Sequence, residues 1–588
     1  MKTRQLNPET FIYALFFLLA LGLRLFQLGA APLTDSEAGW ALQALGVAHG
    51  GVIALGPQPA YILLTSLLFY IFGDTNFLAR LLPALAGSVL VWLPLFFRRW
   101  MGESTWLRRA GLVMALGLAL DPGLVALSRQ AGSSVTALAF TLLALVSLYN
   151  RRMVWTGILA GLALLSGPAV LQGALVMALS WGFIRLMNRR VDQTTTTESE
   201  LEQTPEPVSA SPRLAGVAAF IATLLLAGSL FLRVPQGLGA LAEMLPAYLK
   251  TWTVPSGIPA LRLPAAILVY QPLILIFGLI GAGRAWLRVR EGQQTHQVMA
   301  SLSIWALVAL VLPLLYSGRQ VGDLSWSLVP LWALAAFELS RSFLADEDTN
   351  TRLVAAGLGL LLFVLSVVVW INLLSIGRYQ VSMVMYWAII LGALVLGFIA
   401  VFLTAAGWSM LAARLGMIWA VCVVLGLGMV SSAWGMAVLR PNGAQELWSL
   451  PPATAQPKQL LVTLADLSNW NTGLRDQIEI VSMVDSPAMN WALRNFPNTR
   501  FESALSATES PPVVITSKGT ETPSLAEMYR GQDFVWRVYP GWQSVLPPNF
   551  INWLAFRLAP LGQEQIILWA RVDIFPGGSS GTSEQVTP

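Results

Sequence analysis

Two carboxylates, Asp35 and Glu37, follow the first long apolar segment and are the residues best suited to chemistry. Ionisable side chains this close to a membrane span are costly to place near lipid, and they commonly serve a function. A positioned carboxylate can act as a general base, taking the proton of an attacking hydroxyl or amine. The sequence therefore predicts a candidate catalytic site just after the first span.

The same two acids also fit a purely structural interpretation. Thr34-Asp35-Ser36-Glu37 has the capping-box pattern, in which a Thr caps a helix and a Glu three positions later reaches back to it. An acid in the first turn, as Asp35 would be, also favours the positive end of the helix dipole. Residues two apart lie on different faces of a helix, so both acids can serve one site only if Asp35 lies at or before the helix start. Local chemistry leaves both interpretations open.

The composition indicates a membrane protein. The 588 residues are 55% hydrophobic and only 11% charged, with a mean hydropathy of +0.64, whereas soluble domains carry roughly 25% charged residues. The net charge of +5 is too small and too dispersed to suggest nucleic acid. One cysteine allows no intrachain disulfide, and two separated histidines predict no metal site. No cofactor can be assigned, and a requirement for a divalent cation stays open.

Apolar runs of about 20 residues predict an α-helical polytopic fold with thirteen transmembrane helices. The predicted spans are 11–30, 80–97, 110–127, 131–149, 153–167, 169–187, 214–232, 264–283, 298–316, 324–341, 353–374, 383–405 and 415–437. A further apolar run, 58–73, is the doubtful case. If it does not cross, the basic clusters share the side of the N-terminus, as the positive-inside rule favours: Arg98-Arg99-Arg108-Arg109, Arg151-Arg152, Arg189-Arg190 and Arg284-Arg288-Arg290.

We therefore expect 58–73 to lie along the outer face of the cell membrane. The N-terminus is then cytoplasmic, and thirteen spans place the C-terminal part outside. Single cations lie near the outer span ends: Arg80, Arg129, Arg233, Lys250, Arg262, Arg319 and Arg378. Snorkelling to lipid headgroups explains most cations in such positions. The functional alternative is a cationic lining for a phosphate-bearing ligand.

Composition divides the chain into five parts. The N-terminal membrane module is 1–190, and its first outer loop, 31–79, carries the two acids. Residues 191–212 hold five acids and almost no apolar content, which predicts a disordered cytoplasmic linker. A second membrane module follows at 213–437, and an extracytoplasmic α/β domain at 438–575. The Gly- and Ser-rich tail 576–588 is predicted to be flexible.

Local patterns in the C-terminal domain predict its elements. Three short runs have strand character, and two further stretches have helical character. The predicted strands are 459–464, 512–516 and 565–572, and the predicted helices lie around 487–496 and 524–530.

The first outer loop resembles that of the polytopic GT-C glycosyltransferases, in particular the protein O-mannosyltransferase and lipid A aminoarabinose transferase group. The resemblance rests on the order and spacing of several motifs and covers about residues 11–190. The matching segments are Gly29-Ala-Ala-Pro-Leu-Thr-Asp35-Ser-Glu37-Ala-Gly-Trp40, Gln58-Pro-Ala-Tyr61, Phe72-Gly-Asp-Thr-Asn-Phe-Leu-Ala-Arg80 and Ser128-Arg129.

The resemblance implies transfer of a sugar from a polyprenyl-phosphate donor to a lipid, glycan or protein acceptor at the outer face. It implies Asp35 as the leading candidate for the catalytic base, Glu37 as an acid that helps to shape the acceptor site, and Arg80 and Arg129 as contacts to the donor phosphate. Which of the two acids matches the base of the family stays open. Two departures stand out. Ser36 splits the adjacent acid pair of the family, and the further acid that often follows the position of Arg129 is missing.

These departures leave open one question about the site and two alternative functions. Asp121 is a possible substitute for the missing acid, although Asp121-Pro122 is also a helix-end signal. The chain could instead be a lipid or glycan transporter, which predicts ionisable residues deep within spans and related halves. The other alternative function is a catalytically inactive scaffold of GT-C type.

Overall fold

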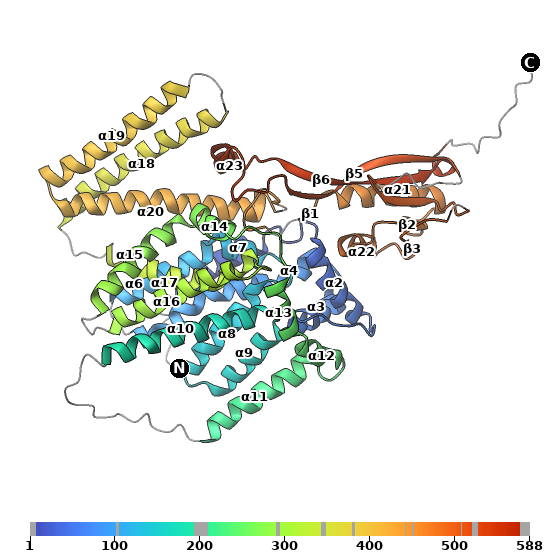
Figure 1. The fold of residues 1–588 in the computed structure, drawn as a ribbon, viewed down its shortest axis with the longest axis horizontal. Coiled ribbons are helices and arrows are strands. Elements are labelled where there is room, and N and C mark those ends of the chain that lie inside the picture. The colour runs from blue at the N-terminus through green and yellow to red at the C-terminus, as the bar shows by residue number, and fades with distance from the viewer. Residues whose placement is uncertain are drawn as a thin grey trace, which may run out of the picture.

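The computed structural model contains a helical bundle and a C-terminal domain built on one sheet (Figure 1). It describes residues 8–101, 105–192, 210–289, 294–342, 348–378, 383–441, 443–449, 452–506, 508–519 and 527–576. The α-helices before the sheet are α1 (Pro8–Leu25), α2 (Asp35–Ala48), α3 (Pro59–Phe72), α4 (Asn76–Val89), α5 (Leu93–Met101), α6 (Thr105–Leu120), α7 (Pro122–Ser128), α8 (Ser134–Tyr149), α9 (Met153–Leu165), α10 (Ala169–Asp192), α11 (Ala210–Gly228), α12 (Gln236–Ala242), α13 (Met244–Thr253), α14 (Arg262–Tyr270), α15 (Pro272–Arg288), α16 (Gln294–Leu315), α17 (Ser325–Ser342), α18 (Thr349–Arg378), α19 (Met383–Gly407) and α20 (Met410–Trp434).

Helices cover each of the thirteen predicted spans, so the predicted class of fold, a polytopic helical membrane protein with a C-terminal α/β domain, is confirmed. Within the described ranges, seven helices are long and apolar enough to cross a membrane, or nine if each of two bent pairs forms one span. The predicted span 214–232 ends early. Leu230, Phe231 and Leu232 all have positive φ, so the chain leaves α11 through a left-handed turn.

Two predicted spans are broken rather than continuous. The helices α6 and α7 meet at 51°, and α14 and α15 meet at 99°. Each second helix begins with a proline, Pro122 or Pro272, which supplies no N–H to the preceding turn. Arg24 of α1 satisfies the freed end of α6, donating to the carbonyls of Leu118 at 3.1 Å and Ala119 at 3.0 Å. Buried backbone carbonyls at the α6–α7 break thus acquire a partner from a neighbouring helix.

The linker and tail predictions fall mostly outside the described residues. Residues 193–209 and 577–588 are not among them. The flanking residues 191–192 and 210–212, which we assigned to the linker, are helical and extend α10 and α11. The run 58–73 forms α3, a helix of 14 residues that packs against α2, α4, α9 and α11. Its predicted course along the outer face stays a prediction.

The C-terminal domain has a six-stranded mixed sheet in the order β1-β5-β6-β4-β2-β3. Strands β2, β3 and β4 run parallel to one another. The other three pairings, β1 with β5, β5 with β6 and β6 with β4, are antiparallel. The strands are β1 (Ala453–Thr454), β2 (Ile480–Ser482), β3 (Thr499–Phe501), β4 (Val513–Ser517), β5 (Tyr529–Pro540) and β6 (Leu561–Arg571), and the helices are α21 (Pro457–Thr472), α22 (Pro487–Leu493) and α23 (Phe550–Phe556).

Most local predictions in this domain are confirmed, and two are wrong. The runs 512–516 and 565–572 lie in strands, and 487–496 contains α22. The run 459–464 lies in α21, because Pro457 starts a helix whose buried residues Leu460, Leu464 and Leu467 follow a helical period. The run 524–530, of which residues 527–530 are described, is predicted to be helical, but β5 begins at Tyr529. Pairing of β5 with β6 overrides the local preference for a helix.

The hydrophobic core connects the two parts of the molecule. One cluster of buried side chains fills the helical bundle and includes Trp448 and Trp553 from the C-terminal part. A second cluster joins α2 and α3 to the sheet domain, placing Ala41 and Ile62 in the same core as Met489, Trp491 and others. The first outer loop and the C-terminal domain therefore fold around one shared core.

Candidate active site

The helix α2 begins with the capping box that the sequence predicts. Thr34 accepts the backbone N–H of Glu37 at 3.4 Å, and the Glu37 carboxylate accepts the backbone N–H of Thr34 at 3.0 Å. This exchange satisfies two of the donors that a helix start leaves open. The structural interpretation of the acids is therefore confirmed for Glu37.

Glu37 also pairs with Arg80 of α4 and is only 3% exposed. Its Oε1 accepts from Arg80 Nε at 2.8 Å and from the backbone N–H of Ala131 at 2.9 Å. Its Oε2 accepts from Arg80 Nη2 at 2.7 Å. The carboxylate thus joins three segments that are distant in sequence: the start of α2, α4 and the α7–α8 loop.

The surroundings of Glu37 keep it ionised. Burial alone would raise the pKa of this carboxyl, but the Arg80 guanidinium and the hydrogen bonds from Arg80, Thr34 and Ala131 hold the pKa below its usual value. A carboxylate with a lowered pKa and donors on both oxygens is a weak general base.

Asp35 turns the other way, toward the C-terminal domain. Its Oδ2 forms an ion pair with Arg537 Nη2 of β5 at 2.6 Å, and its Oδ1 accepts the backbone N–H of Ala488 in α22 at 3.1 Å. About a quarter of the Asp35 side chain remains exposed, at 24%. Of the two predicted acids, Asp35 is thus the one that solvent reaches more readily.

The two predicted phosphate-binding arginines mostly bind the protein itself. All five N–H groups of Arg80 are engaged, by Glu37 and by the carbonyls of Leu28, Ala31 and Pro32. Arg129 caps the C-terminal end of α1. Its Nη1 donates to the carbonyls of residues 23, 24 and 26 at 2.8–3.1 Å, and its Nη2 donates to the carbonyl of residue 27 at 3.3 Å. A cation at a helix C-terminus is favourable.

Arg129 nevertheless contributes positive charge to the site. Burial and the neighbouring Arg80 lower its pKa to about 10, so it stays protonated at neutral pH. Within the described part of the chain, no carboxylate pairs with it. Its hydrogen-bond partners among the described residues are backbone carbonyls.

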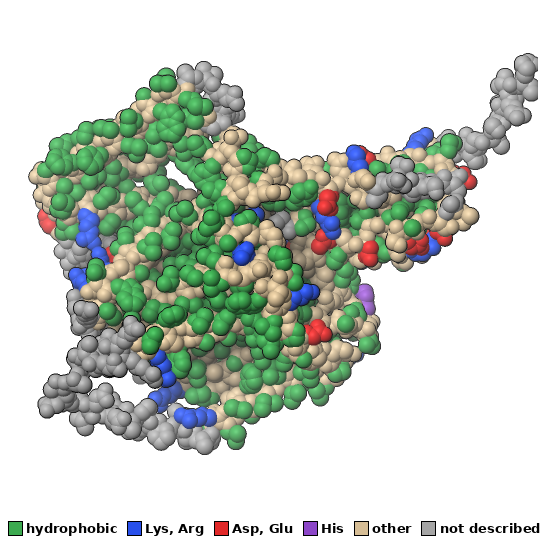
Figure 2. Space-filling view, in the orientation of Figure 1, with side chains coloured by type: hydrophobic (Ala, Val, Ile, Leu, Met, Phe, Trp, Pro, Cys, Tyr) green, Lys and Arg blue, Asp and Glu red, His purple; other side chains and the backbone are tan. Residues whose placement is uncertain are grey.

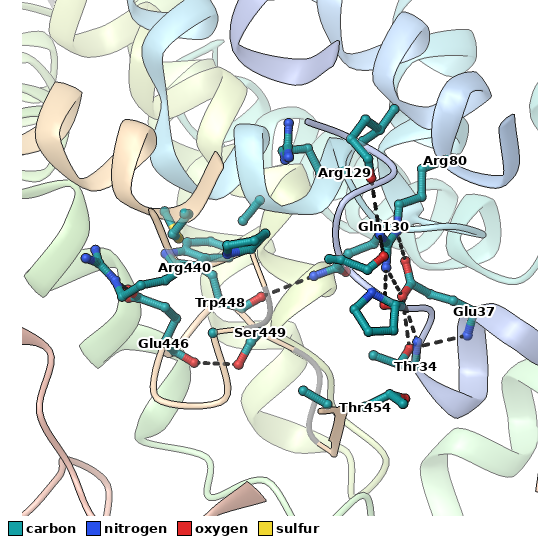
Figure 3. Close-up of a pocket in the computed structure, with 18 residues that line it drawn as sticks. Thr34, Glu37, Arg80, Arg129, Gln130, Arg440, Glu446, Trp448, Ser449 and Thr454 are labelled. Carbon is teal, nitrogen blue, oxygen red and sulfur yellow. Dashed lines mark hydrogen bonds and ion pairs between the residues drawn. The ribbon is translucent and has the colours of Figure 1, made fainter. Parts of the chain in front are cut away.

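A pocket of about 80 Å³ brings these residues together where the bundle meets the C-terminal part, and we call it the junction pocket. One wall holds Thr34, Glu37, Arg80, Arg129 and Gln130, as Figure 3 shows. Asp35 does not line it, although the adjacent Thr34 does.

The opposite wall of the junction pocket escaped the sequence prediction. It comes from the segment after the last span and includes Arg440, Glu446, Trp448 and Ser449 (Figure 3). Arg440 Nε pairs with Glu446 Oε1 at 2.6 Å, and Gln130 Nε2 reaches the Trp448 carbonyl across the pocket at 3.4 Å. The available signal was an arginine and an acid directly after the last span.

Asp121 does not line the junction pocket and has a structural role instead. It is fully buried and caps α7, accepting the backbone N–H of Leu124 at 2.8 Å. It also accepts Gln271 Nε2 at 2.9 Å and Trp332 Nε1 at 2.8 Å. This geometry agrees with the helix-end interpretation. Among the described residues, no group of three or more His, Cys, Asp or Glu could hold a metal ion.

Comparison with known proteins gives structural likenesses only. No protein-family model matches the sequence, and no curated protein matches it. Over 83% of its length the chain is similar to ArnT from Cupriavidus metallidurans bound to undecaprenyl phosphate, with 15% identity, a TM-score of 0.48 and 85% of that chain covered. The apo state of ArnT gives 17% identity, a TM-score of 0.44 and the same coverage.

A third solved structure is also similar to the chain. The Archaeoglobus fulgidus oligosaccharyltransferase in complex with Zn and sulfate has 12% identity and a TM-score of 0.41, over 83% of this chain and 62% of that one.

Proposed function

We propose that the protein is a membrane glycosyltransferase that moves a sugar from a polyprenyl-phosphate donor to an acceptor at the outer face of the membrane. The observation that carries the proposal is the junction pocket. The pocket is lined by Glu37, Arg80 and Arg129, which come from separate segments of the sequence, and by a third arginine, Arg440. A small cationic pocket beside membrane helices suits a lipid phosphate.

The proposed chemistry divides between a base and cations. An acceptor hydroxyl or amine that attacks the sugar carbon loses a proton, and Asp35 takes it. The donor phosphate leaves with a growing negative charge, which Arg129 and Arg440 stabilise. Arg80 contributes indirectly, because all of its N–H groups hold Glu37 and the loop carbonyls in place.

Asp35 is preferred over Glu37 as the base for a physical reason. Glu37 is nearly inaccessible and its lowered pKa weakens it as a base. Asp35 is partly exposed and needs only to exchange its contacts with Arg537 and Ala488 for the acceptor. The proposal therefore requires the acceptor to enter between the first outer loop and the C-terminal domain.

Binding of the donor phosphate can be tested without knowing the sugar. We expect undecaprenyl phosphate to bind the reconstituted full chain more tightly than undecaprenol, which lacks the phosphate. Arg129→Gln and Arg440→Gln should each weaken binding of the phosphate by about tenfold or more, the value of one charge-assisted hydrogen bond. Arg500→Gln, an exposed arginine of the C-terminal domain, is the control and should change nothing. Equal affinity for both lipids would contradict the proposed phosphate site.

Transfer itself is measured with a panel of labelled polyprenyl-phosphate sugars and membrane extracts as acceptor. Asp35→Asn should lower the turnover number by about 10²- to 10⁴-fold while leaving undecaprenyl phosphate binding intact. Asp533→Asn, at an exposed acid of β5 outside the junction pocket, should retain the parent rate. Parent-like turnover in Asp35→Asn would eliminate Asp35 as the base.

A catalytically inactive scaffold is the second candidate, and one observation favours it. Both predicted acids are engaged by internal partners, Glu37 with Arg80 and Asp35 with Arg537. This candidate predicts that undecaprenyl phosphate binds but that no sugar of the panel is transferred. Movement of lipid-linked sugar across the membrane without transfer would instead indicate a transporter.

A further inference from the structure

An apolar groove of about 390 Å³ lies in the helical bundle, apart from the junction pocket. It is bordered by α5, α6, α8, α10, α16 and α17, and its lining includes Leu93, Met114, Leu145, Trp181, Trp305 and Phe337. The lining residues lie around the middle of α6, α10 and α17 and in the first half of α16. Ile184 extends the groove toward the end of α10, which Figure 1 shows on the side of the bundle away from the C-terminal sheet. The volume falls within the usual range of ligand sites.

The interior of this groove suits a hydrocarbon chain. Its two lining hydroxyls are already satisfied, because Ser180 donates to the Val176 carbonyl at 2.7 Å and Ser301 to that of Gln297 at 2.9 Å. No charged side chain lines it. It is also reached from the side, since Trp181 is 56% and Leu145 is 38% exposed. A membrane lipid can therefore enter laterally from its own leaflet.

The rim of the groove is cationic. The Arg185 guanidinium lies 3.9 Å from the centre of the Trp181 ring, which lines the groove. Arg108 lies one turn before the lining residue Gly111 on α6. Glu338, an acid at this end of the bundle, is held by both oxygens to Arg284 at 2.6 and 2.8 Å. Figure 2 shows Lys and Arg side chains gathered at the edge of the bundle opposite the sheet domain.

Unpartnered polar atoms around the groove point to the same kind of ligand. Buried atoms without a partner include Trp305 Nε1 in the lining, Arg108 Nε at the rim, and Trp106 Nε1, whose ring stacks on Phe337. All three are hydrogen-bond donors. Buried donors are costly to leave unpaired, so a ligand that brings only acceptor oxygens to them is favoured. Phosphate and ester oxygens meet this requirement.

We propose that the groove binds one anionic glycerophospholipid, with an acyl chain among the groove residues and its phosphate against Arg185 and Arg108. A polyprenyl-phosphate donor is a poorer fit, because the junction pocket proposed for its phosphate shares no lining residue with the groove. The site is independent of the proposed transfer reaction. It would bind a lipid of the leaflet on which the basic clusters lie.

The test uses the full chain, delipidated and titrated with phosphatidylglycerol, phosphatidylcholine or undecaprenyl phosphate, with bound lipid counted by native mass spectrometry. Ser301→Phe fills the groove. Its control is Leu307→Phe, at a residue of the same helix that is 61% exposed and does not line the groove. Arg185→Gln removes a rim charge, and Arg233→Gln, exposed near the other end of the bundle, is its control.

We expect one tightly bound phosphatidylglycerol in the parent and in both controls. Ser301→Phe should lose it, and Arg185→Gln should bind it about fivefold more weakly, as expected for one cation near a charged lipid. Phosphatidylcholine binding as tight as phosphatidylglycerol, retention of the lipid in Ser301→Phe, or preferential occupation by undecaprenyl phosphate would each overturn the proposal. Because the readout is lipid binding, it does not depend on whether sugar transfer is found.

Discussion

At the scale of single residues, the pair of Glu37 and Arg80 shows how one carboxylate can satisfy a sequence motif without being reactive. The pair is buried on both sides, with 6% and 3% of the side chains exposed. Removing one partner of a buried ion pair leaves an uncompensated charge and costs about 3–5 kcal/mol. We therefore expect Glu37→Gln to lower the unfolding free energy by that amount, measured as thermal stability in detergent.

The matched control for this prediction is Glu479→Gln. Glu479 pairs with Arg500 on the surface, where both side chains are about half exposed, at 45% and 47%. An exposed pair of this kind contributes at most about 1 kcal/mol. If Glu37→Gln and Glu479→Gln have similar small effects on stability, the assignment of Glu37 as a structural carboxylate is wrong.

The pH dependence of stability tests the same residue independently. The folded-state pKa of Glu37 lies below its ordinary value of 4.5, so the folded state binds its proton less readily than the unfolded state does. The stability that Glu37 contributes is fully present above pH 4.5 and is lost as the pH falls through the folded-state pKa. Melting temperatures measured across this acidic range should fall more steeply for the parent than for Glu37→Gln. Parallel curves would contradict the lowered pKa.

At the scale of elements, the broken spans show what hydropathy alone misses. Hydropathy averages over a window, so it predicts one continuous span at 110–127 although Pro122 ends the hydrogen-bond ladder of α6. The sequence contains the signal, since Asp121-Pro122 is a helix-end pair. It does not contain the partners: Gln271 and Trp332, which donate to Asp121, lie 150 and 211 positions away.

Asp121 should therefore be a structural anchor of the bundle. Its carboxylate accepts three buried donors, from Leu124, Gln271 and Trp332. Each donor left unpaired costs about 1–3 kcal/mol, so Asp121→Ala should destabilise the protein by about 3 kcal/mol or more. Asp121→Asn keeps one acceptor oxygen and should have an intermediate effect. The measurement is thermal stability of the solubilised full chain. Equal effects of Ala and Asn would show that the hydrogen bonds are not what stabilises the break.

At the scale of the whole molecule, the sequence predicts the order of the parts but not how they join. Apolar runs locate all thirteen predicted spans in helices, and the composition shift near Arg440 locates the C-terminal domain. The ion-pair partner of Asp35 could not be predicted from the sequence. Arg537 lies about 500 residues away, in a strand whose position depends on the whole sheet. The second wall of the junction pocket could not be predicted either, because Gln130 and Trp448, which meet across it, lie 318 positions apart.

This joining makes the C-terminal domain dependent on the first outer loop. The helix α22 packs its Met489 and Trp491 into the core that it shares with α2 and α3. Trp491 also donates to Asn76 at 2.8 Å, and Arg494 forms an ion pair with Asp74. If the domain were separated from the first outer loop, this face of α22 would expose several buried apolar side chains to water. Each side chain that becomes fully exposed loses about 1.5–3 kcal/mol of burial free energy.

Hydrogen exchange on the full chain and on an isolated fragment of residues 440–576 tests this dependence. In the fragment we expect α22 to lose its protection, because α2, which packs against it in the full chain, is gone. The β4–β6 ladder, paired entirely within the domain, is the internal control and should stay protected in both. Equal protection of α22 in the two proteins would show that the domain has a sufficient core of its own. Loss of protection in α22 together with a protected ladder would show that α22 depends on the first outer loop. The same packing of the loop against the domain holds Asp35 against Arg537 and Ala488.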